Sequence, residues 1–257
     1  MLLKSISVFL VLSVIACSSK PQGQLTIKGQ IKNIGAKSKI YFDELTYTNR
    51  TSLDSVSADA QGNFTIKTKL KNLGLYQIRV ENKQAIFLVL DEHSSSVSVK
   101  ADSSSIQDFT YELKGSPASD QLRKFITDMK KYGEAAGTAM NNYQTAMKDS
   151  ISDSTRTALV AKVEEANNNF RTFAHSYIDT VKNPVIAIFV ATNLDYQSER
   201  AEFDKLEQWV SKDYPNIAGK PVDYPYGPFN DAFTEQQHKY GPFEPIRLAR
   251  SKKQAAK

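Results

Sequence analysis

Short segments of alternating apolar and polar residues, separated by turn residues, fill residues 24–115. This period of two is typical of β-strands that bury one face. The predicted strands cover residues 25–31, 38–45, 63–70, 75–80, 85–90, 97–99 and 109–113. About eight short strands with frequent turns indicate an antiparallel sandwich or an open barrel, with no room for βαβ units. Residues 85–90 are apolar on both faces and are predicted to form a central strand.

The hydrophobic period changes at Ser116-Pro117, where Ser116 is predicted to cap a helix and Pro117 to occupy its first position. Apolar residues then recur every three or four positions over 122–147 and over 159–181, with a polar break at 149–153. Two amphipathic helices joined by a short turn are predicted to pack as an antiparallel hairpin.

Two shorter helices are predicted after the hairpin. Residues 185–193 are apolar almost all round, which indicates a buried helix, and Ser198 is predicted to cap a fourth helix that stops before Pro215. The predicted fold class is therefore α+β, with an antiparallel β-sandwich domain at 24–115 followed by a domain at 116–214 built as an antiparallel helical hairpin or bundle.

The last part of the chain, residues 215–257, is rich in Pro, Gly and aromatic residues and ends in a basic tail. The aromatic residues indicate an irregular segment held on the fold by its rings, and a partner-binding arm is the alternative. Basic residues cluster at the extreme end, at Arg247, Arg250, Lys252, Lys253 and Lys257. The formal net charge of the chain is only +5, so this tail is interpreted as solvated and no nucleic-acid partner is expected.

The N-terminus has the pattern of an export signal. Lys4 precedes a short apolar stretch at 6–16, which is too short to span a bilayer and fits a signal peptide. Val14-Ile15-Ala16-Cys17 resembles the lipobox of bacterial lipoproteins, in which the chain is cut before the cysteine and the thiol is acylated. This resemblance implies a signal peptide at 1–16, a lipid on Cys17 and a polar tether at 17–23.

The predicted location is therefore the cell envelope, where the lipid on Cys17 would attach the chain to a membrane. The residue after the cysteine is Ser18, not the Asp that retains lipoproteins in the inner membrane of some proteobacteria, which favours the outer membrane over the inner membrane.

The chain contains a single cysteine. An intramolecular disulfide, a CxxC redox pair and a zinc site made of thiolates are therefore excluded. The three histidines are scattered. His93 lies in a polar loop beside two carboxylates, where weak binding of a divalent ion is the alternative to a solvated turn, and His175 is interpreted as a boundary residue of a helix rather than a general base. His238 follows Glu235 without the HExxH spacing.

Nucleophile and phosphate-binding motifs are also missing from the sequence, including a GxSxG elbow and a glycine-rich loop. We therefore expect no cofactor, no metal and no enzymatic activity. Four positions, Ser55, Ser150, Ser154 and Thr180, match a short Asp-Ser/Thr pattern that resembles the O-glycosylation site of exported Bacteroidetes proteins, although Thr180 falls within a predicted helix.

Several short phrases resemble one protein family when they are taken together. They are Gln24-Leu-Thr-Ile-Lys-Gly-Gln-Ile-Lys, Leu53-Asp-Ser-Val, Gly62-Asn-Phe-Thr-Ile, Gly74-Leu-Tyr-Gln-Ile-Arg-Val and Leu113-Lys-Gly-Ser-Pro-Ala. They are similar to the N-terminal domain of unknown function of many Bacteroidetes lipoproteins, which usually precedes a thioredoxin-like domain of the disulfide- or peroxide-reductase type. From Gly219 onward the present sequence has neither the length nor the Cys pair of such a domain, so the redox activity does not carry over.

Three functions are compatible with these observations. The first is a non-enzymatic binding or scaffolding module of the envelope, whose partner is a protein or a glycan. The second is an accessory subunit that acts in trans with a separate thioredoxin-like thiol-disulfide oxidoreductase. The third is a hydrolase whose catalytic residues form no familiar motif.

Overall fold

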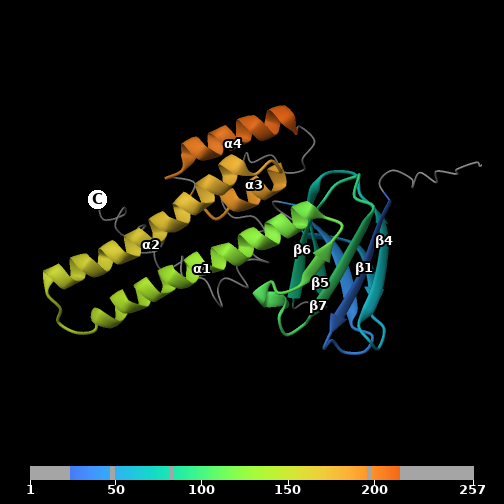
Figure 1. Ribbon diagram of the computed structural model, residues 1–257, viewed down its shortest axis with the longest axis horizontal. Helices are drawn as coiled ribbons and strands as arrows, with labels where there is room; N and C mark the ends of the chain where they lie inside the picture. The colour runs from blue at the N-terminus through green and yellow to red at the C-terminus, as the bar shows by residue number, and fades with distance from the viewer. Residues whose placement is uncertain (1–23, 47–49, 82–83, 196–197, 215–257) are drawn as a thin grey trace, which may run out of the picture.

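The computed structural model describes residues 24–46, 50–81, 84–195 and 198–214. A β-sandwich lies at one end of the molecule, and a long helical hairpin projects from it toward the other end (Figure 1). The described residues form eight strands followed by four α-helices, so the predicted α+β class is confirmed.

The strands form two four-stranded sheets. Sheet I has the order β4-β1-β7-β8 and sheet II has the order β3-β2-β5-β6. Their bounds are β1 Gln24–Lys32, β2 Lys39–Leu45, β3 Arg50–Ser57, β4 Asn63–Lys69, β5 Gly74–Val80, β6 Gln84–Leu90, β7 Ser96–Asp102 and β8 Glu112–Lys114. The two sheets enclose a core of aliphatic and aromatic side chains, among them Ile27, Ile40, Phe42 and Ile66.

The prediction that all strands are antiparallel is wrong for one pair. Strands β1 and β7 run parallel, from Thr26 opposite Ser96 to Lys32 opposite Asp102, whereas every other described strand pair is antiparallel. A short turn forces neighbouring strands to be antiparallel, but β1 and β7 are separated by all the strands of sheet II together with β4. Their relative direction is set by how the chain crosses between the sheets.

The two sheets differ in how their outer faces are covered. Burial alternates along β1 and β4 of sheet I, whereas nearly every residue of β5 in sheet II is buried. Helices pack on β6 of sheet II, and the ring of Phe87 in β6 lies 6.2 Å from that of Phe189. Strand β6 is therefore apolar on both faces although it is an edge strand, which corrects its prediction as a central strand.

Sequence periodicity missed β3 and overestimated β8. Strand β3 is a polar, Ser- and Thr-containing edge strand with largely exposed residues, so it lacks the apolar alternation that marks a buried face. Residues 109–113 were predicted as a strand. Instead, a 3₁₀ turn at Ile106–Asp108 ends at Phe109 with a left-handed φ of 58°, and only Glu112–Lys114 pairs with β7.

The four helices are α1 Pro117–Ala146, α2 Asp153–Thr180, α3 Pro184–Ala191 and α4 Arg200–Asp213. The predicted cap of α1 is confirmed, because the Ser116 side chain accepts a hydrogen bond from the Ser119 N–H. The predicted cap of α4 is wrong. Glu199 occupies that position, and the Ser198 hydroxyl instead bonds to Asp195.

Helix α1 is tied to the sandwich at its first turn. The Ser116 hydroxyl donates to the Val89 carbonyl at 2.9 Å, and the Ser119 Oγ accepts from the Val89 N–H at 2.9 Å. Gly115 precedes this turn with φ of 89°, and a Cβ at this position would lie 2.1 Å from the Ser96 carbonyl oxygen. The junction between sheet and helix therefore requires glycine at 115.

Aromatic rings fill the half of the hairpin nearest the sandwich. Phe125 of α1 stacks on Phe173 of α2 at 5.4 Å and meets Phe189 of α3 edge-on at 6.4 Å. Tyr132 stacks on Phe173 at 4.7 Å. These contacts belong to one continuous hydrophobic core that joins the sandwich to the helices.

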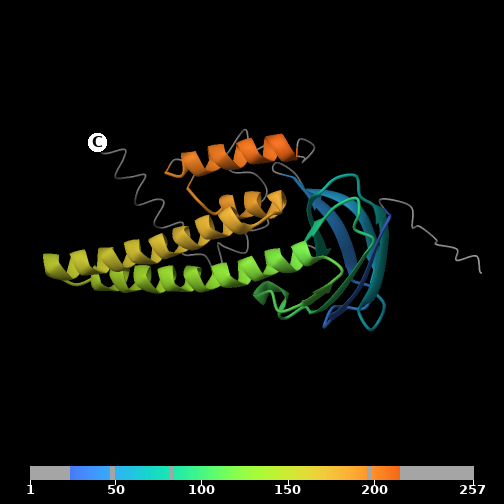
Figure 2. The same cartoon turned by 45° about the horizontal axis from the view of Figure 1, so that its top comes forward.

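The other half of the hairpin, residues 135–165, is named the distal hairpin below. It contains two buried hydrophobic residues, Ala136 and Val163. Helices α3 and α4 lie beside the sandwich end of α2, and no other described element lies against the distal hairpin (Figure 1, Figure 2). The apolar stripe predicted from the sequence therefore continues past the point where the structure covers it.

Candidate functional site

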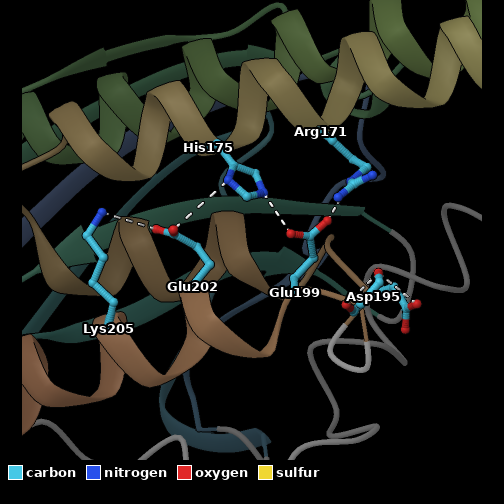
Figure 3. A network of polar contacts seen from close by, with 7 residues as sticks. Arg171, His175, Asp195, Glu199, Glu202 and Lys205 are labelled. Atoms are coloured by element: carbon cyan, nitrogen blue, oxygen red, sulfur yellow. Dashed lines mark hydrogen bonds and ion pairs between the residues drawn. The ribbon is translucent and has the colours of Figure 1, made fainter.

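A group of charged side chains lies between α2 and α4, and most of it is shown in Figure 3. Helix α2 contributes one residue from each of three successive turns, and the start of α4 contributes a second row at three-residue spacing. The members of this group, named the α2–α4 clamp, are Arg171, His175, Asp179, Glu199, Glu202 and Lys205.

Glu199 is at the centre of the clamp and is the most buried of its side chains, with 6% of the side chain exposed. The Arg171 Nε donates to Glu199 Oε1 at 2.5 Å, and the His175 Nε2 lies 3.0 Å from Glu199 Oε2. Both carboxylate oxygens are therefore engaged by α2, which fixes the first turn of α4 against that helix.

A second set of contacts continues along the same two helices. The other imidazole nitrogen of His175 lies 4.0 Å from Glu202, and the Lys205 ammonium lies 3.7 Å from Glu202 and 2.5 Å from Asp179. The hydrogen bond to Asp179 and the charge of Glu202 raise the pKa of Lys205 above its usual value. Both contacts favour the charged form of Lys205.

The geometry of the clamp is that of a structural ion-pair network. Each charged group faces a partner of opposite sign within the clamp. Among the described residues, no group of three His, Cys, Asp or Glu side chains is arranged to bind a metal ion. His175 is partly exposed, which agrees with its interpretation as a boundary residue. The chemistry that this arrangement supports is electrostatic attachment of α4 to α2.

Replacing Glu199 by alanine is expected to lower the free energy of unfolding by about 1–2 kcal/mol, because two charge-assisted hydrogen bonds are lost at a buried position. Replacing Lys205 by alanine is the matched control and should cost less than about 1 kcal/mol, since the Lys205 side chain is largely exposed and its partner Asp179 is half-exposed. Urea unfolding followed by circular dichroism compares the two variants. Equal effects would show that the clamp does not depend on Glu199.

A second polar group is buried on the outer face of sheet II. The Asp43 carboxylate is fully buried and accepts from Arg79 Nε at 2.9 Å and from Gln77 Nε2 at 2.8 Å. The Arg79 guanidinium also lies 4.1 Å from the centre of the Tyr41 ring and donates to the Glu81 carbonyl. Asp43 faces Gln77 across β2 and β5, so this group links two neighbouring strands of sheet II.

His93 lies in a turn between β6 and β7. The Asp91 carboxylate accepts hydrogen bonds from the His93 N–H at 3.1 Å and from the Ser94 hydroxyl at 2.7 Å. The His93 imidazole is largely exposed and lies 3.7 Å from Glu92. These contacts agree with the solvated turn that the sequence indicates.

The four possible glycosylation positions lie in different environments. Ser55 is half-buried in β3, whereas Ser150 and Ser154 are exposed near the turn between α1 and α2. Thr180 is the last residue of α2, and its hydroxyl donates to the Ser176 carbonyl at 2.8 Å. Ser150, Ser154 and Thr180 are therefore exposed, whereas Ser55 is partly covered.

Several sequence predictions fall outside the described residues. They are the signal peptide at 1–16, Cys17 with its tether, His238 and the segment 215–257. Within the described residues, no helix combines the length and the apolarity needed to cross a membrane.

No curated protein matches the chain. Residues 25–122 match a family described as "Domain of unknown function (DUF4369)". The matched residues begin in β1 and end in the first turns of α1, so they include both sheets and the junction at Gly115. The sandwich part of this chain is therefore similar to the domain of unknown function DUF4369.

Proposed function

We propose that this chain is a lipid-anchored lipoprotein of the cell envelope that acts as a non-enzymatic binding or scaffolding module, with the distal hairpin as its binding surface. The observation that supports this proposal most strongly is the position of the distal hairpin. It is uncovered among the described residues, and it lies at the end of the molecule opposite the start of β1 (Figure 1).

The first support is the exposure of apolar side chains on the distal hairpin. The described chain has three exposed large hydrophobic residues, and two of them, Met147 at 40% and Val160 at 37%, are on this part of the hairpin. Met140, Tyr143 and Leu159 are only partly buried. Exposed apolar residues that gather on one projecting element favour a surface that meets a partner.

The second support is the position of the proposed anchor. Only residues 18–23 separate Cys17 from the start of β1 at Gln24. A lipid on Cys17 would hold the sandwich close to the membrane. Helix α1 has 30 residues and is therefore about 45 Å long, so it would carry the distal hairpin well beyond the sandwich, where a partner can reach it.

The anchor is tested by replacing Cys17 with serine. We expect the parent protein to incorporate radiolabelled palmitate and to sediment with membranes, and the Cys17→Ser variant to lose both properties, because serine offers no thiol for acylation. Separation of inner and outer membranes then tests the outer-membrane location that Ser18 favours. Unchanged palmitate labelling of the variant would refute the anchor.

The binding surface is tested by photo-crosslinking in intact cells. A photoreactive amino acid at Gln144, which is exposed on the distal hairpin, should give a discrete adduct of higher mass. The matched control places the same group at Lys28, which is exposed on the sandwich. Equal yields from the two positions, or no adduct from Gln144, would contradict the proposal.

A further inference from the structure

We infer that the occupant of the distal hairpin is a second copy of this chain, so that two hairpins pack side by side as a four-helix assembly. This inference rests on the proposed function, because it identifies the partner of the same surface. It is carried by the distribution of charge along the distal hairpin.

Residues 135–147 of the distal hairpin contain no Asp, Glu, Lys, Arg or His. This stretch is about 20 Å long as a helix, and it carries no charge anywhere on its circumference. The facing part of α2 is charged, with Asp153, Arg156, Lys162, Glu164 and Glu165. Surface helices normally carry charges on their solvent side. The neighbouring part of α2 does so, whereas the stretch of α1 at 135–147 does not.

Two-fold symmetry explains why one helix would lack charge. In a symmetric dimer, residues near the two-fold axis lie close to their own copies. Any charged residue there would meet a charge of the same sign, which disfavours association. An uncharged helix avoids this repulsion, so it can lie beside a copy of itself.

One flank of the uncharged stretch also has the apolar groups that such packing requires. With 3.6 residues per turn, Gly137, Met140, Gln144 and Met147 lie on the same side of α1. Met140 and Gly137 are partly buried and Met147 is exposed. Gly137 leaves this flank without a side chain for one turn, which permits the close approach of a second helix.

The proposed anchor determines the orientation of the two copies. If both chains are attached to one membrane, the two-fold axis runs along the membrane normal. The hairpins then stand side by side and point in the same direction, and each residue of the uncharged stretch lies level with its own copy. Confinement to the membrane raises the effective concentration of the copies, which favours a contact of this modest length.

Cysteine crosslinking in membranes of cells that express the full chain tests the inference, because the parent sequence contains only Cys17. Two differently tagged copies, each carrying Gln144→Cys, are treated with a short bismaleimide. We expect a covalent product of twice the monomer mass that carries both tags. The matched control is Ala161→Cys, an exposed position on the face of α2 that points away from α1, and the parent chain shows whether Cys17 reacts.

Charge variants at Asn141, an exposed residue of the uncharged stretch, complete the test. Asn141→Glu or Asn141→Lys in both copies should each reduce crosslinking through Gln144→Cys by about tenfold, because like charges then face each other. Pairing one Glu copy with one Lys copy should restore it. The resistance of each variant to limited proteolysis shows that the fold is unchanged.

The outcomes separate this inference from the proposed function. A crosslinked product of two copies, weakened by like charges and restored by opposite charges, supports the dimer. A product that contains a different protein overturns the dimer but leaves the hairpin as a binding surface. The absence of any product from Gln144→Cys contradicts both, and insensitivity to the Asn141 variants overturns the symmetric contact.

Discussion

Replacing Asp43 by alanine is expected to lower the free energy of unfolding by about 3–5 kcal/mol. The Asp43 side chain is fully buried and compensates the positive charge of Arg79, of which only 9% is exposed. Without Asp43, Arg79 would keep a buried charge without its carboxylate partner, and the Gln77 amide would lose its acceptor. Equilibrium unfolding in urea, followed by circular dichroism, measures the change.

The matched control is Asp120→Ala. Asp120 forms an ion pair with Arg123 at 2.6 Å, but half of its side chain is exposed, so the loss should be less than about 1 kcal/mol. A double variant, Asp43→Leu with Arg79→Leu, should be closer to the parent than Asp43→Ala, because it removes both charges. If Asp43→Ala unfolds at the same urea concentration as Asp120→Ala, the buried pair does not stabilise the sandwich.

Replacing Phe125 by alanine is expected to cost about 3–5 kcal/mol and to weaken the attachment of the hairpin to the sandwich. Phe125 is fully buried and contacts the rings of Phe173, Tyr177 and Phe189, so a cavity would open where α1, α2 and α3 meet. Thermal unfolding should show a large decrease in the midpoint. Limited proteolysis should show earlier cleavage within the helices.

Met147→Ala is the control for Phe125→Ala. Met147 is an exposed apolar residue of the distal hairpin, and its truncation should change the stability of the monomer by less than about 0.5 kcal/mol. If Met147→Ala is as destabilising as Phe125→Ala, the distal hairpin is packed in the monomer. In that case its apolar residues would not be available to a partner.

Local patterns predicted the helical half of the fold well. Ser116-Pro117 marks the start of α1 because a hydroxyl cap and a proline at the first position suit a helix N-terminus. Asn183-Pro184 marks α3 in the same way, with the Asn183 side chain accepting from the N–H groups of Val185 and Ile186. These signals act over a few residues, so the sequence alone contains them.

The features that the sequence did not reveal depend on contacts between distant segments. The parallel pairing of β1 with β7 is decided by the chain crossing between two sheets, which no local pattern encodes. Strand β6 is buried on both faces because helices pack on it, although it is an edge strand. A central strand buried on both faces would have the same apolar sequence, so the sequence alone cannot tell the two positions apart. Strand β3 is polar because it is an exposed edge, and it therefore lacks a periodic signal.

The α2–α4 clamp illustrates the same limit for a group of side chains. The spacing of Arg171, His175 and Asp179 places them on one face of α2 and was visible in the sequence. Their partners come from α4, which begins at Arg200 directly after Glu199. The charged row on α2 could therefore be identified from the sequence, but its partners could not.

The proposed function gives the two halves of the fold separate tasks. The sandwich and the aromatic packing around Phe125 form the base of the molecule, a continuous hydrophobic core that holds the hairpin in place. The distal hairpin gains little from this core, so its half-exposed Met140, Met147 and Val160 remain available to a partner. Substitutions in the base should therefore affect folding, whereas substitutions in the distal hairpin should affect association.

Attachment of the chain to a membrane through Cys17 is the central feature of the proposed function, and intact-mass spectrometry of protein extracted from native membranes tests it directly. The proposal predicts a polypeptide that starts at Cys17, with added mass equal to a diacylglycerol group alone or together with one further acyl chain. A polypeptide that retains residues 1–16, or one with an unmodified Cys17, would contradict it.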